Sequence, residues 1–290
     1  MFKRKTAGEI IFQFFLVVFL LLFSAITLYP FWDTFRLSIS TPVEAAAPGF
    51  RLFPSEITFS SYVTAFSSDI IARAFWNSTS RTVLGTFLSL LVMISAAYPL
   101  SKRYLPHRNF YTTLIIITMF ISGGLIPTFL LVSQLGLINT FWALIFPGLI
   151  DTWSLIILRN YFQSLPPDLE ESAKLDGAND IFILFRIIIP LATPVIATVT
   201  LWAAVGRWNA WFDNMIYTSD WRLQTLGLFL RKLVIQNEPT SLDMLSEDRV
   251  LLPQSLQSAA IFITMAPILI VYPFLQRYFV KGIMVGSLKG

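Results

Sequence analysis

The chain has 290 residues, of which 55% are hydrophobic, 15% aromatic and only 13% charged, with a formal net charge of +4. Soluble domains carry roughly 25% charged residues, so this composition excludes an ordinary soluble protein and predicts a chain with several membrane spans. A small excess of lysine and arginine is typical of basic cytoplasmic loops, an interpretation that we prefer to nucleic-acid binding.

The same composition excludes several kinds of site. Without any cysteine, the chain has no disulfides, thiolate nucleophiles or cysteine metal ligands. One histidine, His107, cannot build a metal site by itself. A P-loop requires a Gly-Lys pair, and the sequence has none. We therefore expect no metal, no bound nucleotide and no catalytic residues in this chain.

Six apolar stretches reach or approach the roughly 20 residues needed to cross a hydrocarbon core. They are Ile10–Phe31, Thr82–Leu100, Phe110–Leu131, Thr140–Leu158, Ile187–Val205 and Ala259–Leu275. The first is longer than the apolar core of a signal peptide, which favours an uncleaved span. A polar break at Ser133-Gln134, with Gly136 and Asn139, separates the third from the fourth. The sequence predicts an all-α membrane protein with six transmembrane helices.

Basic residues in short loops predict the orientation of these helices. They gather at Lys3, Arg4 and Lys5, after the second span at Lys102, Arg103 and Arg108, and at the C-terminus at Arg277, Lys281 and Lys289. Both termini and the loops 101–109 and 159–186 are thus expected in the cytoplasm. The longer connections, 32–76 and 206–258, then lie outside, with an amphipathic surface helix at Leu223–Val234.

This arrangement divides the chain into three parts. Residues 1–75 comprise the N-terminal tail, the first span and an outer loop. Residues 76–279 form the transmembrane core, and residues 280–290 form a cytoplasmic tail.

A water-soluble, acidic segment at 164–190 lies between two of the apolar stretches. Pro166-Pro167 followed by acidic residues predicts a helix start, because proline is tolerated in the first turn and acids complement the helix dipole. Gly177 predicts a sharp turn after about Leu175. A second helix is expected over Ala178–Ile189, before a kink at Pro190 and Pro194. The residues alone allow either a docking helix for another protein or a solvated loop.

The motif in this segment resembles the EAA motif of ATP-binding-cassette importer permeases. The matching residues are Glu171, Ser172, Ala173, Asp176, Gly177, Ala178, Ile187 and Pro190. Ser172 replaces the first alanine of that pattern, and Ile189 replaces its leucine. The C-terminal KGIMVGSLKG is similar to the tail of maltose-type (MalG-like) permeases. The wider chain resembles the LplC-like carbohydrate permeases.

This resemblance implies a type I importer permease in the bacterial cytoplasmic (inner) membrane, with helix Glu171–Gly177 coupling it to an ATPase. It implies a tail near the ATPase interface, with Lys281, Gly282, Gly286 and Lys289. The implied partners are two ATPase subunits that bind ATP and Mg, a second permease of different sequence, an extracytoplasmic solute-binding protein and an oligosaccharide. That oligosaccharide is a polysaccharide fragment, uronate-rich as in alginate or pectin. Membrane lipid is expected and nucleic acid is not.

Asp151 is the one ionisable residue well inside an apolar run, next to Thr152 and Trp153. An intramembrane carboxylate is by default a functional candidate, facing a translocation cavity. It can equally cap a helix break beside Pro147-Gly148. These two interpretations remain open.

A second candidate for the translocation path is the group Arg207, Trp208 and Asn209. Aromatic faces beside polar groups suit sugar rings, although tryptophans also form belts at membrane interfaces. If the substrate carries carboxylates, Arg207 is the natural group to attract them. The alternative function is an ion-coupled secondary transporter or channel, which needs more intramembrane charges than Asp151 and paired broken helices. An intramembrane hydrolase is disfavoured because the sequence offers no nucleophile and base.

Overall fold

The computed structural model describes residues 7–47, 49–234 and 253–287, with side chains for 8–47, 49–233 and 253–270. Within these ranges the chain is helical and contains no strand, which confirms the all-α prediction. It forms two compact units, one of residues 1–68 with 233–263 and the other of residues 69–232 with 264–290. The predicted division at 75/76 stays a prediction, and helix α4 (Asp69–Ser101) runs unbroken across it.

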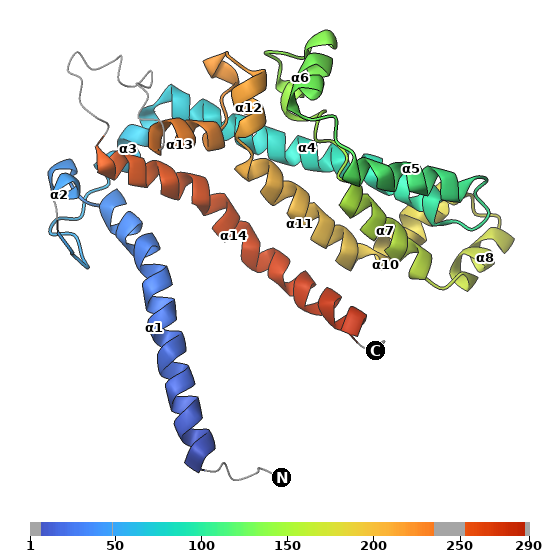
Figure 1. Cartoon of the computed structure of the whole chain (residues 1–290), viewed down its shortest axis with the longest axis horizontal. Helices are drawn as coiled ribbons and strands as arrows, with labels where there is room; N and C mark the ends of the chain where they lie inside the picture. The colour runs from blue at the N-terminus through green and yellow to red at the C-terminus, as the bar shows by residue number, and fades with distance from the viewer. Residues whose placement is uncertain (1–6, 48, 235–252, 288–290) are drawn as a thin grey trace. The chain divides into compact units, whose positions relative to one another are not determined.

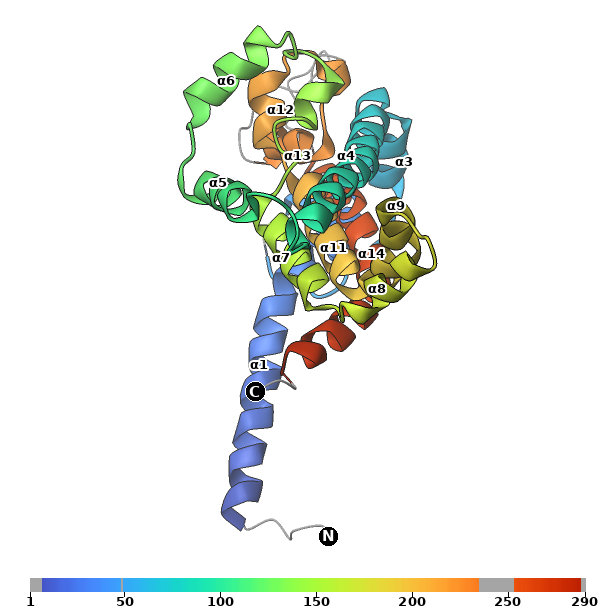
Figure 2. The same ribbon diagram turned by 90° about the vertical axis from the view of Figure 1, so that its right-hand side faces the viewer.

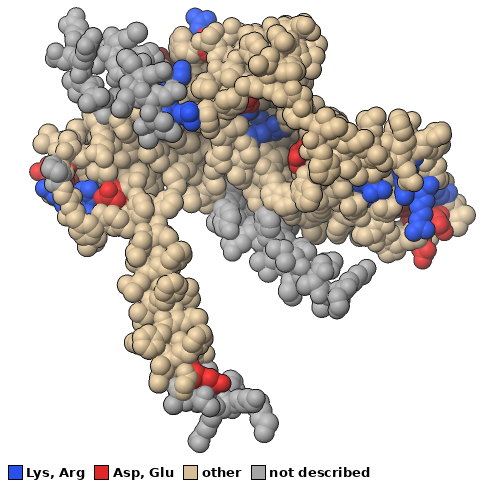
Figure 3. All heavy atoms as spheres, in the orientation of Figure 1, with Lys and Arg blue, Asp and Glu red and all other residues tan. Residues whose placement is uncertain are grey.

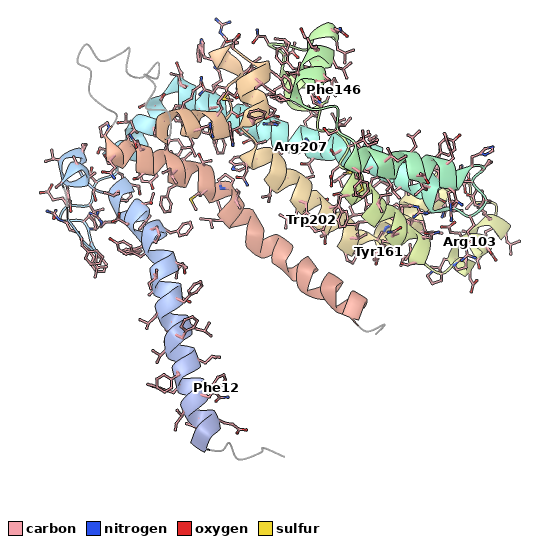
Figure 4. The ribbon with its side chains drawn as sticks, viewed as in Figure 1. Phe12, Arg103, Phe146, Tyr161, Trp202 and Arg207 are labelled. Atoms are coloured by element: carbon pink, nitrogen blue, oxygen red, sulfur yellow. The ribbon has the colours of Figure 1, made fainter. Side chains whose placement is uncertain are left out.

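The first unit contains α1 (Ala7–Ser38), a helix that is apolar on every side. Phe12, Phe15 and Phe19 are each 66% exposed, and Figure 4 shows side chains, Phe12 among them, all around this helix. A helix that is apolar all round and not covered by protein is suited to lipid. Its length and composition fit the predicted first span.

Two short helices, α2 (Pro42–Ala46) and α3 (Ser60–Ser67), follow α1 in the same unit. Glu44 ties this region together. Its carboxylate accepts a hydrogen bond from the Ser55 backbone N–H at 2.8 Å. The same carboxylate forms an ion pair with Arg51 at 3.3 Å.

The second unit is built on α4, along which α7 (Thr152–Ser164) and α11 (Thr193–Asn209) pack, with α5 (Arg108–Phe120) against α7 (Figures 1 and 2). Their facing apolar side chains form one core. Its buried members include Met93, Ala97, Leu155, Leu158, Phe162, Ile183, Ile188 and Val199. This core joins α4, α7 and α11 to the segment that follows α7.

The third apolar stretch is not one straight helix. α5 ends at Phe120, and α6 (Leu125–Gln134) follows at an angle of 114°. Gly124, with φ +83°, adopts a backbone conformation that a side chain would resist, and this permits the bend. The predicted polar break is confirmed, because α6 ends at Gln134 and both Gly136 and Asn139 have positive φ.

The apolar stretch Thr140–Leu158 is not one helix, and the helix break that the sequence allowed beside Pro147-Gly148 is present. A 3₁₀ turn, η1 (Phe141–Leu144), is followed by an irregular stretch, and α7 begins only at Thr152. Pro147 lacks a backbone N–H and Gly148 is flexible, so neither favours a helix there.

Two helices in the described chain are long and apolar enough to cross a membrane, Gly8–Ser38 and Asp69–Ser101. The number rises to four if each bent pair, α5 with α6 and 180–191 with α11, counts as one span. The last helix, α14 (Gln254–Ser287), contains a shorter apolar helix over Gln254–Ile270. The six-span count and the placement of the termini stay predictions.

After α11 come α12 (Phe212–Tyr217), η3 (Trp221–Leu223) and α13 (Leu226–Val234). The amphipathic helix expected from Leu223 begins three residues later, at Leu226. Leu223 belongs instead to the 3₁₀ turn η3, which the Asp220 carboxylate caps by accepting from the Arg222 N–H. Buried Leu226 and Phe229 confirm its apolar face. Its position at the outer leaflet stays a prediction.

Candidate functional site

The acidic segment forms a short helix with a well-defined end. α8 (Asp168–Leu175) follows Pro166-Pro167 and carries its acids in the first turn, as predicted. At its end the Ala178 N–H donates to the Ala173 carbonyl at 2.9 Å, and the Gly177 N–H donates to the Lys174 carbonyl at 3.0 Å. This is a Schellman motif, which requires a left-handed residue, and Gly177 has φ +84°.

The chain then returns towards the membrane helices in a broken path. Asn179 caps α9 (Asp180–Ile183) by accepting from the Phe182 N–H. A π-turn, η2 (Leu184–Ile188), and α10 (Ile189–Leu191) follow, and α11 leaves at 82° to this helix. The second helix predicted from Ala178 therefore begins two residues late and is not uniformly α. The kink predicted at Pro190 and Pro194 is present.

An ion pair fastens α8 to the end of α4. Lys102 Nζ contacts Glu170 Oε1, and the two side chains are only 8% and 16% exposed. Lys102 also lies 4.1 Å from the centroid of the Tyr98 ring. Burial lowers the pKa of Lys102, and its hydrogen bond to Glu170 opposes that shift. The sequence placed Lys102 only in a basic loop, so this contact was not foreseen.

A second, more exposed pair joins the two ends of the turn. Lys174 Nζ lies 3.1 Å from the Asp180 carboxylate, and that hydrogen bond raises the pKa of Lys174. A cavity of about 400 Å³ opens between the end of α4 and α8, lined in part by Arg103, Phe162 and Glu171. Figure 3 shows charged side chains gathered at this end of the unit, over α8 and the start of α5.

The predicted coupling residues divide into two groups. Glu171, Ser172, Asp176 and Gly177 are exposed, whereas Ala173 and Ala178 pack against the chain's own core. Leu175, on the same helix, is 90% exposed.

The predicted tail residues fall at the end of the described chain. Lys281, Gly282 and Gly286 lie within α14, which continues to Ser287. Lys289 lies outside the described residues.

A second site lies among α4, α7, α11 and α12, around a cavity of about 330 Å³. Its lining carries four charged side chains, two arginines and two aspartates. The lining residues are Arg81, Ser89, Met93, Gly148, Asp151, Ser154, Trp202, Ala203, Gly206, Arg207, Ala210 and Asp213. Charged atoms are visible near the centre of this unit in Figure 3.

Arg81 is almost fully buried and is saturated by the protein. Its guanidinium donates to the carbonyls of Leu144 and Ala210, each at 3.0 Å, and pairs with Asp213. These contacts connect α4 with η1 and with the joint between α11 and α12. Arg81 therefore stabilises the fold around the cavity.

Arg207 is different. Its Nη2 donates to the Ser89 hydroxyl and to the Gly148 carbonyl at 2.9 Å, both neutral acceptors. Its buried Nε has no hydrogen-bond partner among the described residues. Among the residues with described side chains, no carboxylate pairs with it.

Asp151 fits both interpretations that the sequence left open. It is the N-cap of α7, accepting from the backbone N–H and hydroxyl of Ser154, and it also lines the cavity. Thr152, beside it, shares a hydrogen bond with Thr118 of α5, and Trp153 is 58% exposed. Of these three neighbours, the structure brings only Asp151 to the cavity wall.

The residues after Arg207 point elsewhere. The Trp208 indole N–H donates to the Thr264 carbonyl at 3.0 Å, and its ring packs edge-on against Phe75, beside a separate apolar cavity. Asn209 is exposed and does not line the charged cavity. Arg207, Trp208 and Asn209 therefore do not line one cavity, because consecutive helix residues face in different directions. Their place on the translocation path stays a prediction.

Helical spacing supplies the signal that the sequence analysis missed. Trp202 and Gly206 lie four residues apart on α11, with Ala203 and Arg207 beside them, and Ala210 follows as the C-cap residue of the helix. Arg81, Gly85, Ser89 and Met93 form the matching stripe of α4. Residues four apart share a helix face, so this spacing in the sequence predicts that each set lies on one face of its helix. Figure 4 shows Trp202 and Arg207 on α11.

Within the described part of the chain there is no group of three or more His, Cys, Asp or Glu side chains that could hold a metal ion.

Comparison with known proteins provides a further finding. Residues 70–285 match the family described as "Binding-protein-dependent transport system inner membrane component". The chain is 42% identical over 267 residues to "Protein LplC" of Bacillus subtilis, covering 92% of this chain and 90% of that protein. It is 40% identical over 274 residues to the "Polygalacturonan/rhamnogalacturonan transport system permease protein YtcP" of the same organism, covering 94% and 96%.

Among solved structures, the fold is similar to a chain in the crystal structure of "a bacterial ABC transporter involved in the import of the acidic polysaccharide alginate". The TM-score is 0.88 at 30% sequence identity, over 96% of this chain and 100% of the other.

Proposed function

The chain belongs to the family of binding-protein-dependent transport system inner membrane components, and from that premise we propose how it is powered and what it carries. It is a permease subunit of an ATP-driven ABC importer and not an enzyme. In the proposed arrangement it crosses the bacterial cytoplasmic membrane six times, with both termini inside.

The coupling proposal rests on the geometry of α8. The helix is joined to the end of α4 by the ion pair between Glu170 and Lys102, and it ends at the turn formed by Gly177. Glu171, Ser172 and Asp176 form the exposed surface that seats in a cleft of an ATPase subunit. Two ATPase subunits bind ATP and Mg, and their closure pushes α8. Because Glu170 is paired with Lys102, that push is delivered directly to α4.

The substrate in this proposal is an oligosaccharide derived from an acidic polysaccharide. Support comes from the similarity of the chain to a polygalacturonan/rhamnogalacturonan permease and to an alginate importer. Asp151 and Arg207 lie on the translocation path, in the charged cavity. A solute-binding protein delivers the substrate from outside, and a second permease of different sequence completes the channel.

A gentle-detergent pull-down of the tagged chain, with mass spectrometry of its partners, tests the assembly. An ATPase subunit and a second permease are expected. Recovery of the chain alone, stable in detergent, would favour an ion-coupled secondary transporter instead.

The coupling helix is tested by Glu171→Lys and Gly177→Asp. Each variant is expected to abolish uptake and weaken ATPase association while the protein stays in the membrane. Normal uptake by either, at normal expression, would contradict the assignment of α8.

A further inference from the structure

Arg207 is a buried charge that no described carboxylate contacts directly. Its residue is 9% exposed, its Nε has no hydrogen-bond partner, and its acceptors Ser89 and Gly148 are neutral. The nearby Arg81 meets Asp213 instead. A charge removed from water without an opposite charge is costly, especially in a membrane helix, so such residues mark functional sites.

The fold holds this guanidinium in place. A Cβ atom at Gly85 would lie 2.9 Å from Arg207 Cδ and 3.0 Å from its Nε, so the missing side chain on α4 makes room for the arginine. The Ser89 hydroxyl that accepts from Arg207 itself donates to the Leu149 carbonyl. The group is therefore positioned before any ligand arrives, which reduces the entropy lost on binding.

The cavity around Arg207 offers three further features. Asp151 presents an acceptor, Trp202 a 44% exposed aromatic face, and the volume of about 330 Å³ lies at the lower end of small-molecule sites. A sugar ring that carries a carboxylate matches this set: its carboxylate suits Arg207, its hydroxyls suit Asp151, and its apolar face suits the indole.

We propose that Arg207 binds the carboxylate of a uronate residue as an acidic oligosaccharide passes through this chain. The ligand supplies the direct carboxylate contact that Arg207 lacks among the described residues. Since Arg81 is already neutralised by Asp213, discrimination between charged and uncharged substrates depends on Arg207. This proposal rests on the proposed function and adds a substrate-selecting residue to it.

The experiment uses the complete importer with its own binding protein in proteoliposomes. Import of trigalacturonate and of its fully methyl-esterified form, which has the same ring but no charge, is measured for wild type and Arg207→Gln. Because the binding protein is unchanged, the ratio of variant to wild type for each ligand isolates the permease. Two further variants are Gly85→Ala, which keeps the charge but displaces it, and Arg73→Gln, an exposed arginine that contacts Trp221.

Arg207→Gln is expected to reduce trigalacturonate import at least about ten-fold and that of the ester less than about two-fold, as for loss of one partner of a buried charge pair. Gly85→Ala should act in the same direction, and Arg73→Gln should change neither. Equal losses for both ligands would show a structural role and overturn the proposal. If wild type imports only the ester, the carboxylate assignment fails while the importer stands. If it shows no ATP-dependent import of any oligosaccharide, the proposed function fails as well.

Discussion

The ion pair between Lys102 and Glu170 gives the sharpest prediction about how α8 is attached. Glu170→Gln keeps the shape of the side chain but leaves Lys102 buried without its counter-charge. Removing one partner of a buried pair costs about 3–5 kcal/mol. The destabilisation cannot exceed the free energy of removing the proton from Lys102, because a neutral amine needs no counter-charge. From an ordinary pKa of 10.5, deprotonation at pH 7 costs about 5 kcal/mol. The Tyr98 ring at 4.1 Å compensates in part.

We therefore expect the free energy needed to separate α8 from α4 to fall by about 2–4 kcal/mol. Amide hydrogen exchange in α8 should then be at least about 30-fold faster. Exchange measured by mass spectrometry on the reconstituted complex reads this directly. ATP hydrolysis should become less dependent on substrate-loaded binding protein, because motion of α8 no longer reaches α4.

The matched control is Asp168→Asn, the same loss of charge two residues earlier in the helix, at an exposed position outside the proposed docking surface. It should leave the exchange of α8 unchanged. Lys102→Met combined with Glu170→Gln should recover much of the protection, because a neutral, packed pair has no uncompensated charge. Exchange in Glu170→Gln within about two-fold of wild type would refute the reasoning.

Three other outcomes are expected. Gly177→Ala should destabilise the turn after α8 by about 1 kcal/mol, because its φ is +84°, and lower uptake without loss of membrane protein in a blot. Asp151→Asn should raise the KM for uptake while a thermal scan stays nearly unchanged, because an amide oxygen still accepts from Ser154; unchanged kinetics would reduce Asp151 to a helix cap. The Ser55 backbone hydrogen bond lowers the pKa of Glu44 from its ordinary 4.5, so this carboxylate stabilises the fold above that pH and the stabilisation is lost as the pH falls through the lowered value. Glu44→Gln should flatten this acid dependence in thermal scans between about pH 5 and 2, and an unchanged profile would exclude Glu44 as its source.

Local signals in the sequence were sufficient to predict where α8 begins and ends. Proline and acidic residues begin α8, and Gly177 ends it, because each acts on the backbone within one turn. The same is true of the break after Gln134. These features depend on neighbours in the chain and do not need the rest of the fold.

The charged cavity could be predicted only in part, since it depends on distant segments. Arg81 lies just outside the apolar stretch that begins at Thr82, so hydropathy alone did not identify it as a site residue. Its partner Asp213 lies 132 positions away. Arg207 was found by its charge, but its helix face was not, because Trp208 and Asn209 were read by proximity in the sequence instead of helical period.

Site-directed cross-linking tests the central claim, that α8 receives its energy from a separate ATPase. The chain has no cysteine, so Ser172→Cys introduces a single thiol on the exposed face of α8. Labelled with a photoreactive cross-linker in the intact complex, it should yield an adduct with an ATPase subunit, identified by mass spectrometry. Ser67→Cys, exposed in α3 on the predicted outer side, should not. Absence of the adduct from Ser172→Cys in an active complex, or equal yield from Ser67→Cys, would contradict the account.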